Sequence, residues 1–341
     1  MTQAAAFIAG TSGLSLTAAE RAFLKDARPW GLILFKRNVD TPAQIVDLVA
    51  DFRACVGRPD APVLIDQEGG RVQRLGPPHW PVYPPGAAYA RLFRSDPAAG
   101  ARAAWLGARL MAADLAALGI TIDCLPLADV PVAGADAVIG DRAYGETPEQ
   151  VATIARAIAD GLADGGVLPV LKHIPGHGRA TADSHLHLPV VDADRATLDA
   201  TDFAAFRRLA DLPMAMTAHV VFTAFDPVLP ATTSRTMIQD VIRSLIGFGG
   251  LLMSDDVSMA ALSGSIGERS AAALAAGCDV ILHCNGKLDE MREVATNVPR
   301  LAGDAARRAE AALAARHAPR PFDAAAARAE FVRLIGETVT S

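Results

Sequence analysis

The segment LPVLKHIPGHGRATADSHLHLPVV, residues 168–191, joins an apolar run to a loop of chemically reactive side chains. Residues 167–171 have the length and branched content of a strand that is buried on both faces. The loop that follows is rich in Gly, Pro, His and Asp, and such loops carry function on rigid scaffolds. The segment therefore predicts a β-strand whose C-terminal end opens onto a functional site.

The same order, an apolar strand followed by a polar loop, recurs along the chain. We predict eight strands, at residues 7–10, 31–35, 61–65, 120–126, 167–172, 214–217, 250–253 and 279–283. Helices are expected at residues 17–26, 41–54, 97–118, 148–163, 194–210, 233–246 and 266–276, and through the C-terminal part. Alternating βαβ units imply parallel strands with right-handed crossovers. Eight such units close into a (β/α)8 barrel with its active site at the strand C-termini.

An open doubly wound α/β sheet is the alternative fold. That fold would concentrate polar residues at one switch point, whereas here they follow most strands. A length of 341 residues suits one barrel. We therefore expect a single catalytic domain over residues 1–341, with a helical segment from about 303 to 341 packed on it. Hydrophobic residues make up 51% of the chain but aromatic residues only 5%, so Ala, Leu, Val and Ile are expected to fill the core.

Composition also restricts the partners. The net charge is −6 and no block of Lys or Arg occurs, which argues against nucleic acid. No run of about 18 apolar residues and no leader-like N-terminus is found, which predicts a cytoplasmic protein without a membrane segment. The four cysteines form no CxxC pair, so neither a disulfide framework nor a thiolate zinc site is expected. The sequence leaves the oligomeric state open.

Four histidines in one loop raise the possibility of a metal-dependent hydrolase. His173 and His177 are four positions apart, but Pro175 and Gly176 lie between them and prevent the helix on which an HExxH pair shares a face. The glutamate of that motif is also missing. We therefore predict neither a metal nor another cofactor.

Several polar motifs occur together in a specific order. They are GLILF (31–35), IDQEGGRVQRL (65–75), GDRAYG (140–145), KHIPGHG (172–178), DSHLHLP (183–189), TAHVVF (217–222), LLMSDDVSM (251–259) and CDVILHCN (278–285). In this combination the chain resembles the beta-N-acetylhexosaminidases of glycoside hydrolase family 3. The resemblance implies hydrolysis of terminal beta-linked N-acetylglucosamine (GlcNAc). In bacterial members it implies action on cell-wall fragments that carry GlcNAc on 1,6-anhydro-N-acetylmuramic acid, with or without a peptide.

The resemblance also implies catalytic residues. A retaining glycosidase needs a nucleophile on one face of the sugar and a proton donor near the leaving oxygen. The nucleophile falls on Asp255, at the end of a predicted strand. Because neighbouring strand residues point to opposite faces, Asp256 is interpreted as a cap for the following turn.

Proton transfer is assigned by the resemblance to His185, oriented by Asp183. In an extended loop residues i and i+2 face the same side, so the Asp183 carboxylate would reach the His185 ring and fix its tautomer. His177 and His187 are expected to structure the loop, and His219 to lie near the site without taking part in the reaction.

Substrate binding is assigned to five polar residues that match the family's sugar-contacting positions: Asp66, Arg74, Arg142, Lys172 and His173. A carboxylate accepts hydrogen bonds from sugar hydroxyls, while Arg and Lys donate to hydroxyl or carbonyl oxygens. A purely structural interpretation is that Arg142 pairs with Asp141 or Glu146. Three other functions remain open: a substrate-assisted hexosaminidase, a beta-GlcNAc phosphorylase and a non-catalytic sugar-binding barrel.

Overall fold

The central sheet of the protein closes into a ring. The computed structural model describes residues 4–184 and 186–336. In the sheet the strands follow the order β7-β6-β3-β2-β1-β13-β12-β10-β8, and all neighbours are parallel. Their bounds are β1 (Ala5–Ala9), β2 (Pro29–Leu34), β3 (Val63–Ile65), β6 (Ile122–Asp123), β7 (Leu168–Pro169), β8 (Leu171–Ile174), β10 (Met214–Thr217), β12 (Leu251–Asp256) and β13 (Val280–Leu282).

The two ends of that order, β7 and β8, are consecutive in the chain. Only Val170 separates them, so they act as one strand that pairs with β6 on one side and with β10 on the other. The sheet therefore has eight strand positions and closes on itself. The predicted (β/α)8 barrel is confirmed, and the open doubly wound sheet is excluded.

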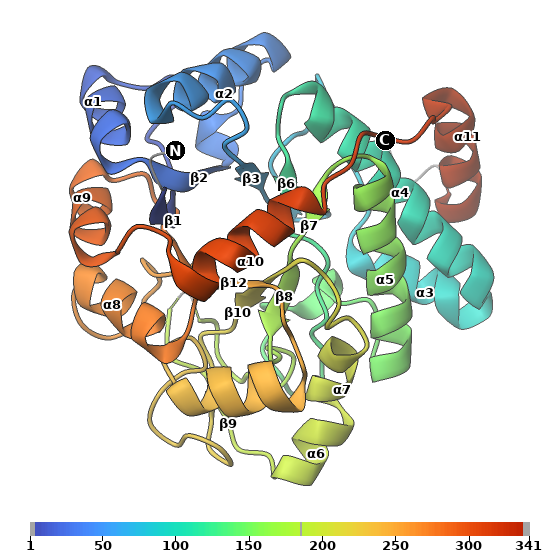
Figure 1. Ribbon diagram of the computed structural model, residues 1–341. Coiled ribbons are helices and arrows are strands. Elements are labelled where there is room, and N and C mark those ends of the chain that lie inside the picture. Colours follow the sequence, from blue (N-terminus) through green and yellow to red (C-terminus); the bar gives the residue numbers. More distant parts are fainter. Residues whose placement is uncertain (1–3, 185, 337–341) are drawn as a thin grey trace.

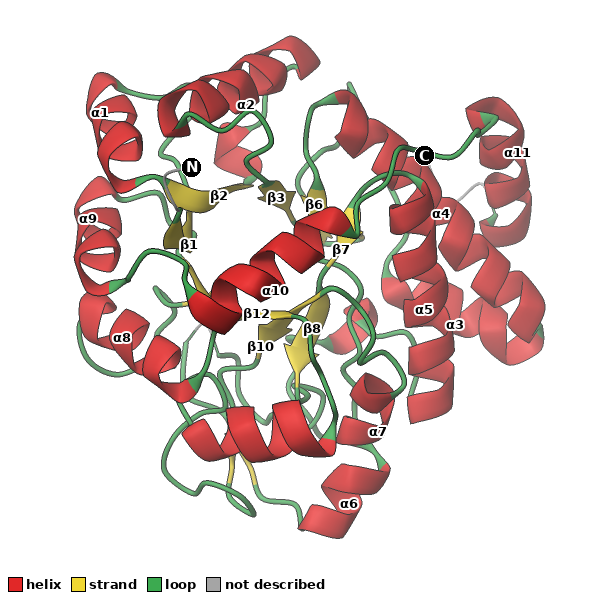
Figure 2. Ribbon diagram, viewed as in Figure 1, coloured by secondary structure: helices red, strands yellow, loops and turns green. Residues whose placement is uncertain are grey.

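Helices surround the ring of strands, as Figures 1 and 2 show. They are α1 (Ala18–Ala27), α2 (Pro42–Val56), α3 (Gly86–Ser95), α4 (Pro97–Ala117), α5 (Pro148–Asp164), α6 (Arg195–Ala200), α7 (Asp202–Arg207), the π-helix η3 (Met237–Leu245), α8 (Ile266–Ala276), α9 (Leu288–Asn297), α10 (Gly303–Ala314) and α11 (Ala324–Ile335). Short 3-10 turns lie at η1 (Lys36–Asn38) and η2 (Gly140–Arg142). None of the helices in residues 4–184 and 186–336 is both long and apolar enough to cross a membrane.

Two local expectations were wrong. The single helix predicted at residues 194–210 is two helices, because Thr201 leaves helical geometry and its hydroxyl bonds Thr197 O and Asp202. The connection after β3 contains an unpredicted hairpin, β4 (Gln67–Gly69) and β5 (Val72–Gln73). Gly69 has a φ of +93°, and a Cβ there would lie 2.3 Å from Pro84 O, so only glycine fits this turn.

Helix α10 closes the N-terminal end of the barrel. In Figure 1 it crosses in front of the strands. Ala309 and Ala312 belong to the same buried cluster as Ile8 and Met214, which fill the barrel interior. Just before the helix, Leu301 N donates to Ala4 O at 2.8 Å. The far end of the barrel is therefore covered by small side chains that allow close packing.

A buried ion-pair network anchors α10. Asp279 is buried, and its two oxygens accept from Arg243 on η3 and from Arg308 on α10, each at 2.9 Å. Leu252 N donates to Asp279 at the same distance. One carboxylate thus connects η3, β12 and α10.

We expect Asp279→Asn to lower the free energy of unfolding by about 3 kcal/mol, because breaking a buried pair leaves two guanidinium groups with poorer partners. Urea denaturation measures this. Asp304→Asn is the matched control, since Asp304 also pairs with Arg308 but is 71% exposed and should contribute less than about 1 kcal/mol. Equal effects of the two substitutions would contradict the anchoring role.

Candidate active site

A cavity of about 530 Å³ opens at the C-terminal ends of the strands. Polar residues of β8 and β12 and of the connections that follow β3, β6 and β8 line it, beside an apolar wall that includes Phe35, Met216 and Leu282. Of the predicted site residues, the cavity wall contains Asp66, Arg74, Arg142, Lys172, His173, Asp183 and Asp255. The closed barrel therefore brings together side chains that are up to 189 positions apart in the chain.

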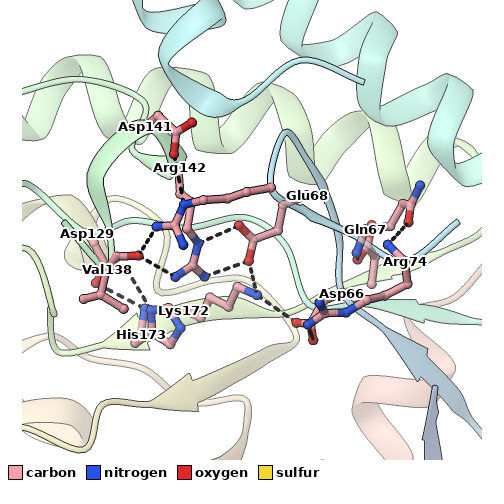
Figure 3. A network of polar contacts seen from close by, with 12 residues as sticks. Asp66, Gln67, Glu68, Arg74, Asp129, Val138, Asp141, Arg142, Lys172 and His173 are labelled. Carbon is pink, nitrogen blue, oxygen red and sulfur yellow. Dashed lines mark hydrogen bonds and ion pairs between the residues drawn. The ribbon is translucent and has the colours of Figure 1, made fainter. Parts of the chain in front are cut away.

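Lys172 lies between two carboxylates at the floor of the cavity (Figure 3). Its Nζ is 3.0 Å from Asp66 Oδ1 and 2.7 Å from Glu68 Oε1, and its side chain is only 2% exposed. A buried ammonium group is stable only when it is paired, and the two carboxylates raise its pKa despite the opposing effect of burial. Lys172 therefore stays charged at neutral pH.

Arg142 donates two parallel hydrogen bonds to Glu68. Its Nε and Nη2 donate to the two carboxylate oxygens, each at 2.8 Å, and Nη1 donates to Val138 O at 3.1 Å. The ion-pair partner is thus Glu68, not Asp141 or Glu146 as the structural interpretation supposed. Asp141 pairs with Arg71 at 3.2 Å instead.

Arg74 is the last member of a group of charged side chains at the bottom of the cavity, called the charged floor below: Asp66, Glu68, Arg74, Arg142 and Lys172. Its Nη2 donates to Asp66 Oδ2 at 3.0 Å, and its guanidinium lies over the Phe35 ring, 5.0 Å from the centroid. Burial by itself would raise the pKa of Asp66, but Lys172 and Arg74 hold it well below its ordinary value. In the same way, burial opposes but Lys172 and Arg142 bring the pKa of Glu68 down to about 2. Both carboxylates are therefore ionised acceptors at neutral pH.

Gln67 holds the hairpin that presents these carboxylates. Its side-chain oxygen accepts from Arg74 N and Leu75 N at 3.0 Å, and its amide donates to Leu75 O. Its backbone N–H donates to the buried Asp123 at 2.9 Å. The alternation of Asp66, Gln67 and Glu68 thus places two carboxylates toward Lys172 and one amide into the turn.

His173 is oriented by Asp129, a residue without a predicted role. Asp129 is fully buried, and its Oδ2 accepts from His173 Nδ1 at 2.8 Å. This contact places the proton of a neutral His173 on Nδ1 and leaves Nε2 as an acceptor. Asp129 Oδ1 accepts from His177 N at 2.6 Å. Although burial opposes it, His173 lowers the pKa of Asp129.

Asp255 lies near the end of β12 and lines the same cavity as Asp66 and Lys172. Asp256 N donates to Asp255 Oδ1 at 2.8 Å, and Asp255 N donates to Thr217 Oγ1 at 3.3 Å. These contacts hold the strand end and one oxygen of its carboxylate in place.

Asp256 also lines the cavity, so the expectation that only one of the two acids faces it was too simple. Its carboxylate is nevertheless occupied by the turn that follows. Oδ1 accepts from Ser258 N at 3.0 Å and Cys284 N at 3.1 Å, and Oδ2 accepts from Ser258 Oγ at 2.6 Å. The strand end twists away from regular geometry here, since its register with β13 shifts before Asp256.

The segment after Asp183 is a turn, not an extended loop. Asp183 O accepts from Leu186 N at 3.0 Å and from His187 N at 2.9 Å. The backbone at Asp183 therefore differs from the extended loop that was expected. His185 itself lies outside the described residues. Asp183 is half-buried on the cavity wall, whereas His187 is exposed.

His219 is fully buried beside the site. Its Nδ1 is 2.7 Å from Thr232 Oγ1, and its Nε2 is 3.0 Å from Asp256 O. Burial lowers its pKa, so the ring is neutral at neutral pH and donates from one nitrogen only. Over residues 4–184 and 186–336, no group of three or more His, Cys, Asp or Glu side chains is arranged to hold a metal ion.

Comparisons with known proteins were made for the sequence and for the fold. The profile of the glycosyl hydrolase family 3 N-terminal domain matches residues 7–313. A curated protein named Beta-hexosaminidase from Alkalilimnicola ehrlichii is 41% identical over 280 residues, which are 81% of this chain and 79% of that protein.

Solved structures with a similar fold were found as well. NagZ from Neisseria gonorrhoeae, in complex with N-trifluoroacetyl-D-glucosamine, matches with a TM-score of 0.87 and 32% identity, over 98% of this chain and 99% of that one. A glycoside hydrolase family 3 beta-N-acetylglucosaminidase from a Paenibacillus species matches with a TM-score of 0.85 and 29% identity, over 96% of this chain and 66% of that one.

Proposed function

Because this chain belongs to glycosyl hydrolase family 3, we propose that it is an exo-acting, retaining beta-N-acetylglucosaminidase. The observation that carries the proposal is the position of Asp255 on the wall of the cavity that also contains Asp66 and Lys172. A carboxylate beside a charged, hydrogen-bonding floor suits attack on a polar sugar. The glucosamine derivative bound to the similar Neisseria protein supports an acetamido sugar as the substrate.

In the first step of the proposed reaction, an oxygen of Asp255 attacks the anomeric carbon from one face. The bond to the leaving oxygen breaks, and that oxygen takes a proton from the acid on the opposite face. The Asp256 N–H bond to Asp255 Oδ1 fixes the orientation of the nucleophile. The product of this step is a covalent glycosyl ester of Asp255.

We assign the proton to His185, with Asp183 as its orienting carboxylate. An unperturbed imidazole has a pKa of about 6.5, and a neighbouring carboxylate favours the charged form that donates the proton. In the second step the neutral ring accepts a proton from water, the water oxygen attacks the anomeric carbon, and the bond from that carbon to the Asp255 oxygen breaks. The sugar leaves with its original beta configuration, and Asp255 regains its carboxylate.

Sugar binding is assigned to the charged floor and to His173. The ionised Asp66 carboxylate has lone pairs that Lys172 and Arg74 do not use, and these accept from sugar hydroxyls. His173 Nε2 accepts a hydrogen bond from a further hydroxyl, because Nδ1 donates to Asp129 Oδ2. Arg142 keeps Glu68 ionised and in place beside Lys172.

We further propose that the natural substrates are cell-wall fragments that carry GlcNAc on 1,6-anhydro-N-acetylmuramic acid, handled in the cytoplasm. Support for a reducing compartment comes from the cysteines. Cys55, Cys124, Cys278 and Cys284 are all free and buried, which is usual for cytoplasmic proteins.

A hydrolysis panel tests the substrate class. We expect release of GlcNAc from aryl beta-GlcNAc and from GlcNAc–anhydro-N-acetylmuramic acid, with much slower hydrolysis of aryl beta-glucoside. Hydrolysis of the glucoside at an equal kcat/KM would overturn the acetamido specificity. Binding of GlcNAc without any released product would identify a sugar-binding barrel instead.

Product analysis separates the two remaining mechanisms. The same assay in phosphate buffer should yield free GlcNAc, whereas a sugar 1-phosphate would identify a phosphorylase. An activated 2-fluoro sugar should label the peptide that contains Asp255. Persistent absence of the adduct, with the analogue shown to bind, would favour attack by the substrate's own acetamido group. That route needs a second acid to orient the acetamido group, and both oxygens of Asp256 already accept hydrogen bonds from Ser258 and Cys284.

A further inference from the structure

A buried hydrogen bond lies directly behind Asp183. Ser184 is buried, and its Oγ is 3.1 Å from Nε2 of His177, which is also buried. The backbone oxygen of Ser184 accepts from Ala261 N at 3.3 Å, in the loop that follows β12. Ser184 is therefore attached by its side chain to the start of its own loop and by its backbone to the loop after Asp255.

The His177 ring that holds Ser184 is itself fixed in position. His177 N donates to Asp129 Oδ1 at 2.6 Å, and the ring packs edge-on against His173 with centroids 5.8 Å apart. Asp129 Oδ2 accepts from His173 Nδ1 at 2.8 Å. One buried carboxylate thus connects the ring of His173, on the cavity wall, with the backbone of His177, whose ring holds Ser184.

The bond between His177 and Ser184 does not depend on a charged ring. Burial lowers the pKa of His177 to about 4, so the ring is neutral at neutral pH. In one tautomer Nε2–H donates to the Ser184 hydroxyl, and in the other the hydroxyl donates to Nε2. Either arrangement keeps the two side chains together.

Asp183 and Ser184 differ in where they face. Asp183 lines the cavity, whereas Ser184 is buried against His177. Asp183 also begins the turn that ends at His187, because its carbonyl oxygen accepts from Leu186 N and His187 N. Because Ser184 is held in place, the peptide bond between Asp183 and Ser184 is held as well. The direction in which the Asp183 side chain leaves the backbone is therefore fixed.

We propose that His177 and Ser184 are positioning residues for catalysis. Their hydrogen bond holds the turn that presents Asp183 to the cavity, and Asp129 couples this turn to His173 on the sugar-binding wall. The inference rests on the proposed function, since it assigns the turn to proton transfer. It adds three residues, Asp129, His177 and Ser184, that act through others and do not touch the reacting atoms.

The test uses the dependence of the rate on the leaving group. Loss of proton transfer slows substrates with poor leaving groups, whereas an activated aryl group leaves without help. For Ser184→Ala we expect kcat/KM to fall on the order of 10- to 100-fold on the cell-wall disaccharide, the scale of a misplaced catalytic group. On dinitrophenyl beta-GlcNAc kcat/KM should stay within about 3-fold, because it reports the first step, in which this leaving group needs no proton. On the same substrate kcat and KM should fall together, because the misplaced base slows hydrolysis of the glycosyl ester.

Two variants of His177 distinguish loss of the hydrogen bond from loss of the fold. Gln places a polar nitrogen close to the position of His Nε2, so His177→Gln should retain more activity on the disaccharide than His177→Phe, which keeps a ring but has no hydrogen-bonding atom. Thr181→Ala, in the exposed part of the same loop, is the control and should match wild type. Thermal unfolding of each variant shows whether the fold is retained.

The outcomes separate this inference from the proposed function. If the wild type cleaves neither substrate, the proposed function fails and the positioning role fails with it. If the wild type cleaves both, but Ser184→Ala lowers kcat/KM equally on both or on neither, the positioning role alone is overturned. A selective loss of kcat/KM on the disaccharide, together with rescue by His177→Gln, supports it.

Discussion

Replacing Asp255 by Ala should reduce kcat on aryl beta-GlcNAc about 10⁴-fold or more, the scale seen when a covalent nucleophile is removed. The reason is geometric. Asp255 is held by Asp256 N at a strand end that faces the cavity, and the other acid beside it, Asp256, already accepts hydrogen bonds from Ser258 and Cys284 through both oxygens. Initial rates measured on an activated substrate test this directly.

Chemical rescue identifies the role of the missing group. In Asp255→Ala, added azide should enter the space left by the carboxylate and attack the same face, giving an α-glycosyl azide from a β-substrate. Asp255→Asn fills that space with a neutral amide, so it should be equally slow and should respond poorly to azide. Turnover of Asp255→Ala within tenfold of wild type, in protein that is still folded, would contradict the assignment.

Replacing Lys172 by Met should be the most destabilising change at the site. Lys172 is paired with Asp66 at 3.0 Å and with Glu68 at 2.7 Å, inside the protein. Removal of one partner from a buried ion pair costs about 3–5 kcal/mol, because the remaining charges lose their compensation. Urea denaturation should show a loss of this size, a large part of the 5–15 kcal/mol that is typical of folded domains.

Lys287→Met is the control, because Lys287 also pairs with a glutamate but its side chain is 70% exposed. It should change stability by less than about 1 kcal/mol. Acid titration gives a second measurement. The pKa of Glu68 is lowered to about 2, so its stabilisation is present above the ordinary value of 4.5 and is lost as the pH falls toward 2. Without Lys172 this acid-dependent loss should be smaller, and an unchanged profile would contradict the role of the pair.

The barrel could be predicted from the sequence because its signal is repeated. Each apolar strand is short, but eight of them alternate with helices and most are followed by polar residues, so an error at one element does not alter the fold. The exact ends of the helices and strands were harder to predict. The helix break lies at one residue, Thr201, whose φ of −119° and ψ of −80° are not helical, and the β4–β5 hairpin has strands of only three and two residues.

The members of the charged floor were partly predicted. Asp66, Lys172 and Arg142 were identified by motif, but Glu68 and Asp129 were missed. Their partners lie far away in the chain, Arg142 at 74 positions from Glu68 and His173 at 44 positions from Asp129. The useful signal for Glu68 was its place two residues after Asp66, which puts both carboxylates on one side of a strand.

The loop around Asp183 could not be predicted from local sequence spacing. The spacing of Asp183 and His185 was interpreted as an extended pair, whereas the carbonyl oxygen of Asp183 accepts from Leu186 N and His187 N. Ser184 is buried through contacts with His177 and with Ala261, which lies 77 positions later. Only the tertiary structure supplies these contacts, so a local pattern could not decide between a turn and an extended loop.

The helix that covers the N-terminal end of the barrel has a consequence for how glycans are handled. Helix α10 lies across that end, and buried side chains fill the barrel interior behind the charged floor. The cavity is therefore reached from the C-terminal ends of the strands. For the exo-acting hydrolase proposed above, we therefore expect that a polysaccharide does not thread through the barrel and that the last sugar of a chain is the one that reaches the bottom. In the proposed reaction we also expect the freed sugar to leave through the opening by which the next substrate arrives, so that each round of cleavage ends with the product in the entrance until it departs.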